Sequence, residues 1–501
     1  MQKYSHIFDT TQLEKNLKGR TVRAGVYSIA AEIANQILRV GAIVALARLL
    51  MPEHFGLVSM VTALTVFAER FKHLGLSTVT IQQKTITHEQ VSTLFWVNTA
   101  AGGGIALLIT AASWGIAAFY HEPRLVLISM ALSLSFLVSG MNVQHEALLR
   151  RQMRFRELGA IQIVANFLSI GLAIVLALDG YTYWALVWKE VTRPVVELVG
   201  VWTVCRWWPG LPRRNSGVRS LLKVGGNIAS VDMVYFISQN MGQVLLGKFS
   251  GAYALGLYRQ ATQLISLPIS QICYPIGNVT LPSLSVLQDQ PEQYRRYFQK
   301  VVGLVFFVAA PLVVCLAMFP NDIVRLVLGA QWIEASEIFR VLAIGALIEP
   351  LFSVCSMVMI TRRRTDLLFR WAVLYGCMSV VGFSIGVYWG AFGVACGYAV
   401  ANYLLVAPSL IIGLKGSPVS IGLFFQAVSK PILFSMIMAV FLGVFAHSTE
   451  SWQSLGRLIA AVLVAITTYG ALWIGYPSAR AKLFEDITSL VSGLKPMGKS
   501  T

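Results

Sequence analysis

The chain contains a succession of apolar runs, each about as long as the 20-residue helix that spans the hydrocarbon core of a bilayer. A transmembrane β-strand needs only about 9–11 residues, so these runs are too long for a barrel. Because the bilayer core offers no water to the backbone, helices and closed barrels are the structures that cross it. The runs therefore predict an all-α, polytopic membrane protein. A content of 13% charged residues, against roughly 25% in soluble chains, agrees with that prediction.

The apolar runs predict about fourteen transmembrane helices, and the loops between these helices alternate in charge. Every second loop is rich in Lys and Arg, and the intervening loops are short and poor in cations. Cytoplasmic loops carry such an excess of Lys and Arg, so we expect both termini in the cytoplasm. Because the net charge of +17 is concentrated in these loops, it does not indicate a nucleic-acid partner. The predicted spans lie near residues 24–48, 55–75, 91–119, 124–144, 158–179, 182–205, 219–247, 254–285, 299–319, 334–360, 367–387, 390–413, 429–447 and 454–476.

The sequence around the end of the first span recurs 200 residues later. Arg48 recurs as Lys248, and Gly56 recurs as Gly256. Six predicted helices separate the copies, so both copies cross the membrane in the same direction and form a parallel repeat. Two-lobed repeats are typical of alternating-access transporters, whose site lies between the lobes. The predicted organisation is a basic cytoplasmic tail (1–23), an N-lobe of six helices (24–205), a cytoplasmic linker (206–218), a C-lobe of six helices (219–413), two further helices (414–476) and a cytoplasmic tail (477–501).

Ionisable side chains inside the spans mark candidate sites, because they are costly there unless they face protein or water. On the first span the polar residues are spaced i, i+3, i+4 and i+7, which places them along one side of a helix. The sixth span has the densest charges, followed by Pro194, which should kink it. The polar residues are Glu32, Asn35, Gln36 and Arg39 in the first span; Lys189, Glu190, Arg193 and Glu197 in the sixth; Asp232, Gln239 and Gln243 in the seventh; Arg259 and Gln263 in the eighth; and Glu349 in the tenth.

Two interpretations of these charges stay open. The pairs Glu190–Arg193 and Glu32–Arg39 could serve only to hold helices together. Arg48 lies near the outer end of its helix, where a long cation reaches the headgroups at little cost. The repeat symmetry of the stripes instead favours a shared hydrated cavity. Arg and Lys suit a phosphate-bearing substrate, and acids suit a coupling proton or Na⁺.

Two stretches carry a resemblance to a known family: "LARLLMPEHFGLVSM" (46–60) and "ALGLYRQATQLISLPISQICYPIGNVTLPSLSVLQDQPEQYRRYF" (254–298). Together with the two-lobe repeat they resemble the polysaccharide transport family of the multidrug/oligosaccharidyl-lipid/polysaccharide (MOP) exporter superfamily, in particular its colanic-acid-exporter-like (WzxC-like) branch of lipopolysaccharide and exopolysaccharide flippases. The resemblance covers roughly residues 20–415. It implies twelve core helices around a cationic cavity. It also implies transport of undecaprenyl-pyrophosphate-linked oligosaccharide units across the bacterial inner membrane, with membrane lipids and the polysaccharide polymerase or copolymerase machinery as partners.

The resulting hypothesis assigns a role to each polar residue. No catalytic residue, metal site or cofactor is expected, apart from a coupling H⁺ or Na⁺, because the histidines are scattered and no cysteine pair has CxxC spacing. The assignments are substrate binding for Arg39, Lys189, Arg193 and Arg259; outer gating for Arg48 and Lys248; ion coupling for Glu32, Glu190, Asp232 and Glu349; and cavity lining for Asn35, Gln36, Gln239, Gln243 and Gln263.

Three other functions are less consistent with the sequence. A MATE-like drug antiporter would prefer an acidic cavity for organic cations, and the cation-rich spans argue against one. A membrane polysaccharide polymerase would need a sizeable extramembrane loop, whereas every outer loop is short and no nucleophile–base or metal constellation is found. A scaffold protein would have no use for charges inside the membrane.

Overall fold

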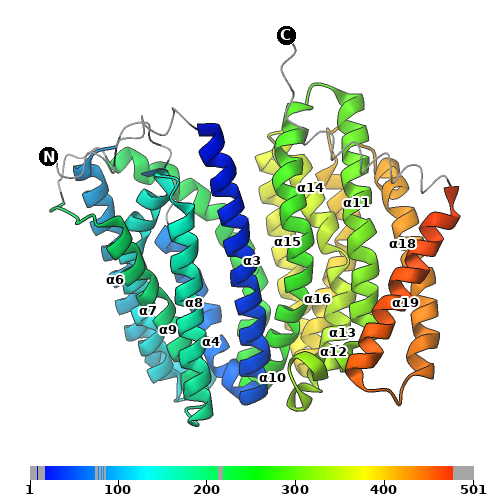
Figure 1. Ribbon diagram of the computed structural model, residues 1–501, viewed down its shortest axis with the longest axis horizontal. Coiled ribbons are helices and arrows are strands. Elements are labelled where there is room, and N and C mark those ends of the chain that lie inside the picture. The colour runs from blue at the N-terminus through cyan, green and yellow to red at the C-terminus, as the bar shows by residue number, and fades with distance from the viewer. Residues whose placement is uncertain are drawn as a thin grey trace. The chain divides into compact units, whose positions relative to one another are not determined.

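The computed structural model describes residues 8, 17–73, 77, 80–81, 83, 86–212 and 218–477, without the side chains of 17–24, 66–73, 218–239, 273–275 and 278–279. Within this part of the chain the regular elements are helices, and no strand occurs (Figure 1). The helices are α3 (Leu17–Leu49), α4 (Pro52–His73), α6 (His88–Tyr120), α7 (Leu125–Arg151), α8 (Phe155–Leu178), α9 (Tyr183–Cys205), α10 (Val218–Val286), α11 (Pro291–Met318), α12 (Pro320–Val327), α13 (Ala335–Ala346), α14 (Glu349–Thr361), α15 (Thr365–Gly386), α16 (Gly390–Leu404), α17 (Val406–Gly413), α18 (Ile421–Ser448) and α19 (Ser454–Gly475), with short 3₁₀ turns at Ala330–Trp332 and Val387–Trp389.

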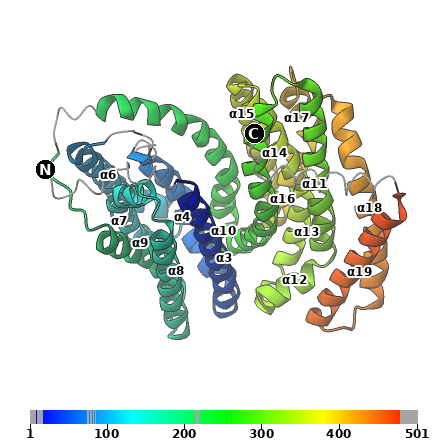
Figure 2. The same ribbon diagram turned by 45° about the horizontal axis from the view of Figure 1, so that its top comes forward.

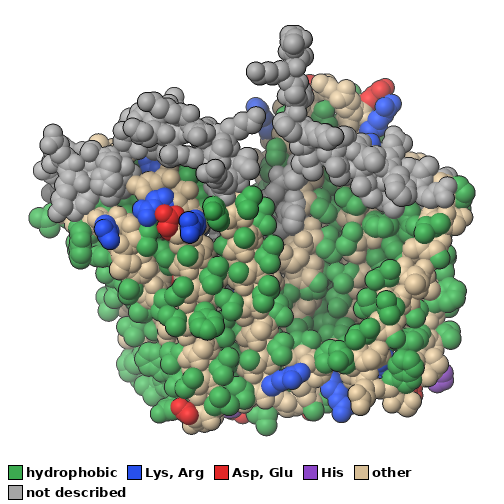
Figure 3. Space-filling model, viewed as in Figure 1, with side chains coloured by type: hydrophobic (Ala, Val, Ile, Leu, Met, Phe, Trp, Pro, Cys, Tyr) green, Lys and Arg blue, Asp and Glu red, His purple; other side chains and the backbone are tan. Residues whose placement is uncertain are grey.

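Apolar helices of membrane-spanning length dominate the structure. Among the described residues, nine helical stretches are long and apolar enough to cross a bilayer. On the face drawn in Figure 3, hydrophobic side chains cover the middle of the described surface, and charged side chains gather toward its two ends. An exposed apolar surface of this extent is stable in lipid rather than in water. The prediction of an all-α, polytopic membrane protein is confirmed, whereas the number of fourteen spans stays a prediction.

The chain divides into two compact units, Met1–Arg259 and Gln260–Thr501, and the division falls inside α10. In the first unit α6 packs on α7, α8 on α9, α7 on α9 and α3 on α8; Figure 2 shows α6 to α9 as neighbours. In the second unit α11 packs on α18, α15 on α16, α13 on α16 and α18 on α19. The core of the first unit includes the fully buried Trp207, and that of the second includes Trp371 and Trp332.

The two spans predicted at 219–247 and 254–285 both lie in α10, which consists of two helices joined at a kink within the predicted outer loop. The helix changes direction at Gly251, where φ is 80° and ψ is −178°. Glycine adopts such a conformation without strain because it has no Cβ. A single glycine therefore turns the chain between these two segments.

Two other predicted spans each consist of two helices. The span at 334–360 is broken between α13 and α14. Pro350 has no N–H to donate to the Ala346 carbonyl, which explains the interruption. The span at 390–413 is likewise divided at Leu405, between α16 and α17. A broken helix inside a span leaves backbone carbonyls that other groups must satisfy.

Part of the segment predicted as a linker, 206–218, is packed against the first unit. Trp207 is fully buried, and its Nε1 donates to His88 Nδ1 at 3.0 Å. The Gly210 amide donates to Ser92 Oγ at 2.9 Å. These bonds fix the chain between α9 and α10 to the first turns of α6.

An arginine-rich turn occurs once in each unit with the same backbone geometry. It joins α7 to α8 and α14 to α15, and its left-handed residue is Met153 (φ 56°) in the first copy and Arg363 (φ 55°) in the second. In each copy two amides return to carbonyls of the preceding helix, as at a Schellman C-terminus. These bonds are Arg154 N to Leu149 O at 3.0 Å and Met153 N to Arg150 O at 3.0 Å, and Arg364 N to Met359 O at 2.8 Å and Arg363 N to Ile360 O at 2.9 Å.

The arginine side chains of the two turns also play corresponding parts. Arg151 Nη1 donates to the Thr80 carbonyl at 3.0 Å, in the segment between α4 and α6. Arg362 Nη1 donates to the Gln288 carbonyl at 2.8 Å, in the segment between α10 and α11. Each arginine thus satisfies a carbonyl of the connection that enters the third helix of its repeat. The two copies share a geometry that their residues alone did not reveal.

Candidate functional site

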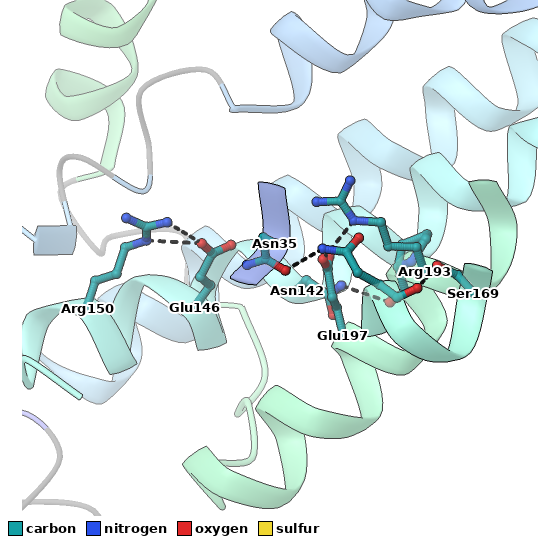
Figure 4. A network of polar contacts seen from close by, with 9 residues as sticks. Asn35, Asn142, Glu146, Arg150, Ser169, Arg193 and Glu197 are labelled. Carbon is teal, nitrogen blue, oxygen red and sulfur yellow. Dashed lines mark hydrogen bonds and ion pairs between the residues drawn. The ribbon is translucent and has the colours of Figure 1, made fainter. Parts of the chain in front are cut away.

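Helix α9 carries the densest group of charges in the first unit. Lys189 Nζ donates to Glu190 Oε1 at 2.9 Å. Arg193 Nε donates to Glu197 Oε1 at 3.1 Å, as Figure 4 shows. These pairs replace the Glu190–Arg193 pair considered from the sequence. Arg193 lies one residue from the midpoint of α9, and its side chain is 48% exposed. A cation at this depth, with an exposed side chain, is available to a ligand.

Arg259 of α10 interacts with Glu190, one of the acids of this α9 group. Its Nη1 donates to Gln243 Oε1 at 3.0 Å, and Gln243 is only 7% exposed. Lys189, Arg193 and Arg259 all lie close enough to Glu190 to interact with it electrostatically. The structure therefore brings together three of the four predicted substrate-binding cations around one predicted coupling acid. Arg193 uses its Nε to pair with Glu197. The remaining guanidinium donors of the group suit phosphate oxygens.

The stripe predicted on the first span is divided in the structure. Arg39 forms an ion pair with Glu32, and its Nη2 donates to Gln36 Oε1 at 2.8 Å. Asn35 is buried instead and accepts a hydrogen bond from Asn166 Nδ2 of α8 at 2.7 Å. The amide of Asn35 thus joins α3 to α8, and its predicted role in lining a cavity stays a prediction. Within the described residues the partners of Arg39 are Glu32 and Gln36, so it is not part of the α9 group.

Figure 4 shows that the polar side chains around α9 include groups that the sequence did not single out. Asn142 of α7 donates from Nδ2 to the Pro194 carbonyl at 3.1 Å. The bond supports the helix next to the proline that was expected to kink it. Buried asparagines within apolar helices were a signal that the sequence offered, since a buried amide requires partners.

Lys248 makes its contacts at the end of the first unit where α6 turns into α7. Its Nζ donates to the Phe119 carbonyl and lies 3.1 Å from His121 Nδ1. The same ammonium lies 5.0 Å from the centre of the Phe119 ring, in a cation–π contact. Lys248 therefore joins α10 to the end of α6, which supports a fastening role more than a ligand-binding one.

A second ion-pair group lies at the same corner. Arg124 Nη2 donates to Glu53 Oε1 of α4 at 2.6 Å, and Arg124 Nε donates to Glu122 Oε1 at 2.7 Å. The hydrogen bond from Arg124 lowers the pKa of Glu122 below the ordinary carboxyl value. The sequence analysis missed this group because each residue stands alone in a short loop, and only the fold joins them.

The two glycines of the sequence repeat meet at this corner. A Cβ at Gly56 would lie 1.7 Å from the Ala252 carbonyl oxygen, and a Cβ at Gly256 would lie 1.9 Å from the Pro52 carbonyl oxygen. Both distances are far below any contact between nonbonded atoms. Each glycine thus contacts the backbone of the other copy of the motif, and a side chain at either position would force α4 and α10 apart.

Glu349 opens α14 in the second unit, directly after the break that separates α13 from α14. Tyr398 of α16 donates from Oη to Glu349 Oε1 at 2.5 Å. Two further α16 side chains reach the same break, where Asn402 Nδ2 donates to the Gly345 carbonyl and Tyr403 Oη donates to the Ile344 carbonyl. Among the described residues, the hydrogen-bond partner of this acid is therefore a neutral hydroxyl group.

Four predicted site residues lie outside these groups or outside the described side chains. Arg48 is exposed in the last turn of α3, and Gln263 is half-buried in the second unit. Asp232 and Gln239 lie on α10, but their side chains fall outside the described part of the chain. Their predicted roles therefore stay predictions.

The fold is one that membrane flippases and transporters share. It resembles the lipid II flippase MurJ in an inward closed conformation with a TM-score of 0.74 and 15% sequence identity, over 90% of this chain and 99% of that one. It also resembles an inward-facing multidrug resistance MATE family transporter of the MOP superfamily, with a TM-score of 0.58 and 14% identity, over 77% of this chain and 97% of that one.

Residues 45–337, more than half of the chain, match the family described as polysaccharide biosynthesis protein, and the chain belongs to that family. The teichuronic acid biosynthesis protein TuaB of Bacillus subtilis (strain 168) is 27% identical over 84% of this chain and 88% of its own length. The lipopolysaccharide biosynthesis protein WzxC of Escherichia coli (strain K12) is 23% identical, over 80% and 82%. The succinoglycan biosynthesis transport protein ExoT of Rhizobium meliloti (strain 1021) is 23% identical, over 66% and 67%. The resemblance inferred from the sequence is confirmed.

Proposed function

We propose that this protein is a flippase for lipid-linked oligosaccharides, which it moves from the cytoplasmic to the periplasmic leaflet of the bacterial inner membrane. The cargo is an undecaprenyl-pyrophosphate-linked repeat unit of a surface polysaccharide. Both termini lie in the cytoplasm, and transport proceeds by ion-coupled alternating access. Family membership and relatives named for polysaccharide biosynthesis support the cargo class. The likeness in fold to a lipid II flippase supports the architecture that such transport needs.

One observation carries the assignment to an anionic lipid-linked cargo: Lys189, Arg193 and Arg259 share Glu190 within the membrane-spanning part of the first unit. Cations at this depth are costly and often mark a substrate path, which favours a ligand-binding role over pairing alone. The pyrophosphate of the carrier lipid provides oxygens that guanidinium donors bind in pairs. The same excess of cations argues against a MATE-like antiporter for cationic drugs.

Arg193→Gln combined with Arg259→Gln is expected to reduce glycan export by about a hundred-fold or more, because each hydrogen bond to a charged group contributes about 1.5–3 kcal/mol and the double variant removes two such donors. Glutamine keeps length and polarity but removes the charge. Export is measured as surface polysaccharide in a deletion strain that expresses each variant, with membrane insertion checked by immunoblot. Lipid-linked units should accumulate on the inner leaflet. A polymerase defect would instead leave single units on the outer side.

Arg340→Gln is the matched control for this pair. Arg340 forms an ion pair with Glu337 at 3.0 Å, but at an exposed position in the second unit. The variant loses the same charge and is expected to export normally. Normal export by the double variant of Arg193 and Arg259 would contradict the cationic site.

Lys248→Met is expected to loosen the outer end of the first unit. The change removes a charged hydrogen-bond donor and a cation–π contact while keeping the apolar stem. In a background without the six native cysteines, Ser59→Cys provides a buried reporter on α4. Its modification by a membrane-impermeant maleimide added from the periplasmic side should accelerate about ten-fold, as expected for the loss of a charged hydrogen bond.

Lys248→Arg keeps a cation and its donors, so its reporter should react at the rate of the parent protein. Equal reactivity in the Met and Arg variants would show that Lys248 does not fasten this end of the molecule.

A further inference from the structure

Glu349 differs from the other acids inside the membrane-spanning helices. Of the described acids that lie more than one turn inside a membrane-spanning segment, counting α13 and α14 as one segment, the others form ion pairs with basic side chains. These pairs are Glu32 with Arg39, Glu146 with Arg150, Glu190 with Lys189, and Glu197 with Arg193. Glu349 accepts a hydrogen bond from the neutral hydroxyl of Tyr398 and has no basic partner among the described residues.

The position of Glu349 makes an unpaired negative charge on it energetically costly. The span Ala335–Thr361 is centred one residue before it, so the carboxyl group lies near the middle of the span. An unpaired carboxylate at that depth is unfavourable, and such residues mark ion or proton paths in transporters. The break between α13 and α14 places the acid at the start of a half-helix, an arrangement that coupling-ion sites in transporters use.

Three side chains of helix α16 contact the break between α13 and α14. Tyr398, Asn402 and Tyr403 are spaced i, i+4 and i+5, so they lie on adjoining parts of one side of the helix. Asn402 Nδ2 donates to the Gly345 carbonyl at 3.2 Å, and Tyr403 Oη donates to the Ile344 carbonyl at 3.1 Å. A Cβ at Gly345 would lie 2.8 Å from Cε1 of Tyr398, so a larger residue there would displace the tyrosine ring.

The donors around the break decide which ion the acid can hold. A hard metal cation needs a cage of several oxygen ligands, but the Ile344 and Gly345 carbonyls already accept hydrogen bonds from α16. Among the described residues, the titratable groups identified near the break are tyrosines: Tyr398 and Tyr403 of α16, and Tyr375 of α15, which interacts electrostatically with Tyr398. One carboxylate that faces a neutral hydroxyl donor suits a proton, which needs a single oxygen, better than a hard cation, which needs several.

The side-chain oxygen of Asn402 is consistent with a protonated state of Glu349. Asn402 is fully buried, and its Oδ1 has no hydrogen-bond partner in the described part of the chain. A buried acceptor without a donor is uncommon in a folded protein. A neutral carboxyl group on Glu349 would add one O–H donor to this region, which contains the unpaired acceptor Asn402 Oδ1.

We propose that Glu349 is the proton-binding site of this transporter, alternating between a carboxylate that accepts the Tyr398 hydroxyl and a neutral carboxyl group that carries one proton. The inference rests on the proposed function, since it names the ion that drives transport. Proton uptake converts the carboxylate to the carboxyl form and release reverses it, so charge and atoms balance without another reactant. A neutral Glu349 removes the cost of the buried charge and favours a different set of conformations than the charged form.

Two measurements on full-length protein test the proposal. In proteoliposomes with a defined lipid-linked oligosaccharide, an imposed pH gradient is expected to accelerate flipping by wild type, whereas an imposed Na⁺ gradient is not. Glu349→Gln, which mimics the neutral form, should flip at the same rate with and without the pH gradient. Glu349→Asp keeps a titratable group and should retain the acceleration. Glu337→Gln removes an acid from α13 at an exposed ion pair and should behave as wild type.

The second measurement is independent of flipping. Purified wild type in detergent should take up one more proton than Glu349→Gln during an acid titration followed with a pH dye. Acceleration of the wild type by Na⁺ and not by protons would overturn the proposal without any variant, and so would equal proton uptake by the two proteins. If the extra proton is present and no gradient produces flipping, the proton site stands and the flippase function fails.

Discussion

Gly256→Ala is expected to destabilise the protein by more than about 3 kcal/mol, the upper end of what overpacking costs where side chains can move. A Cβ at this position would lie 1.9 Å from the Pro52 carbonyl oxygen. The obstacle is backbone, so no rotamer change relieves it, and α4 and α10 must separate. Size-exclusion profiles of a fluorescent fusion and its melting temperature in detergent should show loss of the monodisperse folded protein.

Gly41→Ala is the matched control, because nothing lies within 4 Å of its Cβ position on α3. It should be neutral, or slightly stabilising, as for a glycine replaced within a helix. Gly56→Ala should be as harmful as Gly256→Ala, since its Cβ would lie 1.7 Å from the Ala252 oxygen. A Gly256→Ala protein that melts with wild type would mean that the two helices do not cross at these glycines.

Arg457→Met is expected to cost about 3–5 kcal/mol of stability, the range for removing one partner of a buried ion pair. Arg457 Nη1 donates to Asp322 Oδ2 at 3.0 Å, and the two side chains are 16% and 9% exposed. Its guanidinium also donates to the Ala446 carbonyl and lies 5.6 Å from the Phe319 ring centre. The residue thus connects the start of α19 to the end of α18 and to α12, and its loss leaves Asp322 charged and unpaired.

The pair Arg340–Glu337 provides the comparison for this prediction. Its bond is also 3.0 Å long, but the side chains are 41% and 56% exposed. Arg340→Met should therefore change stability by no more than about 1 kcal/mol. Thermal unfolding of the two variants, and of Asp322→Leu with Arg457→Met, measures the effect of burial. If the double variant is no more stable than the Arg457 single variant, the unpaired charge is not the cause of the loss.

The architecture followed from the sequence because length and polarity decide what crosses a bilayer. The runs at 158–179 and 454–476 correspond to α8 and α19 within a few residues. The breaks were harder to place, since proline and glycine act through the surrounding fold. Pro350 interrupts a span, whereas Pro311 lies inside the continuous helix α11. The same residue type gives different outcomes, depending on how neighbouring groups satisfy the carbonyl that it leaves without a donor.

The candidate site could be predicted in part. Spacing placed Glu32 and Arg39 together correctly, because seven residues complete nearly two helical turns. Asn35 lies about 60° around the helix from Glu32. Because of this rotation its side chain faces α8 and accepts a hydrogen bond from Asn166. The partners supplied by distant segments, such as Tyr398 for Glu349 and Phe119 for Lys248, depend on tertiary packing that one sequence does not specify.

The arginine-rich turn that occurs in both units has an evolutionary consequence. Met153 and Arg363 are both held in a left-handed conformation that favours glycine, yet neither copy has acquired one. Two turns that both place a non-glycine residue in the left-handed conformation are more readily inherited from one ancestral segment than acquired twice. The sequence predicts that the two copies cross the membrane in the same direction, because six predicted helices separate them. On that prediction, a half-length ancestor would have functioned as a homodimer inserted in a single orientation. It would not have needed the dual topology from which inverted repeats arise.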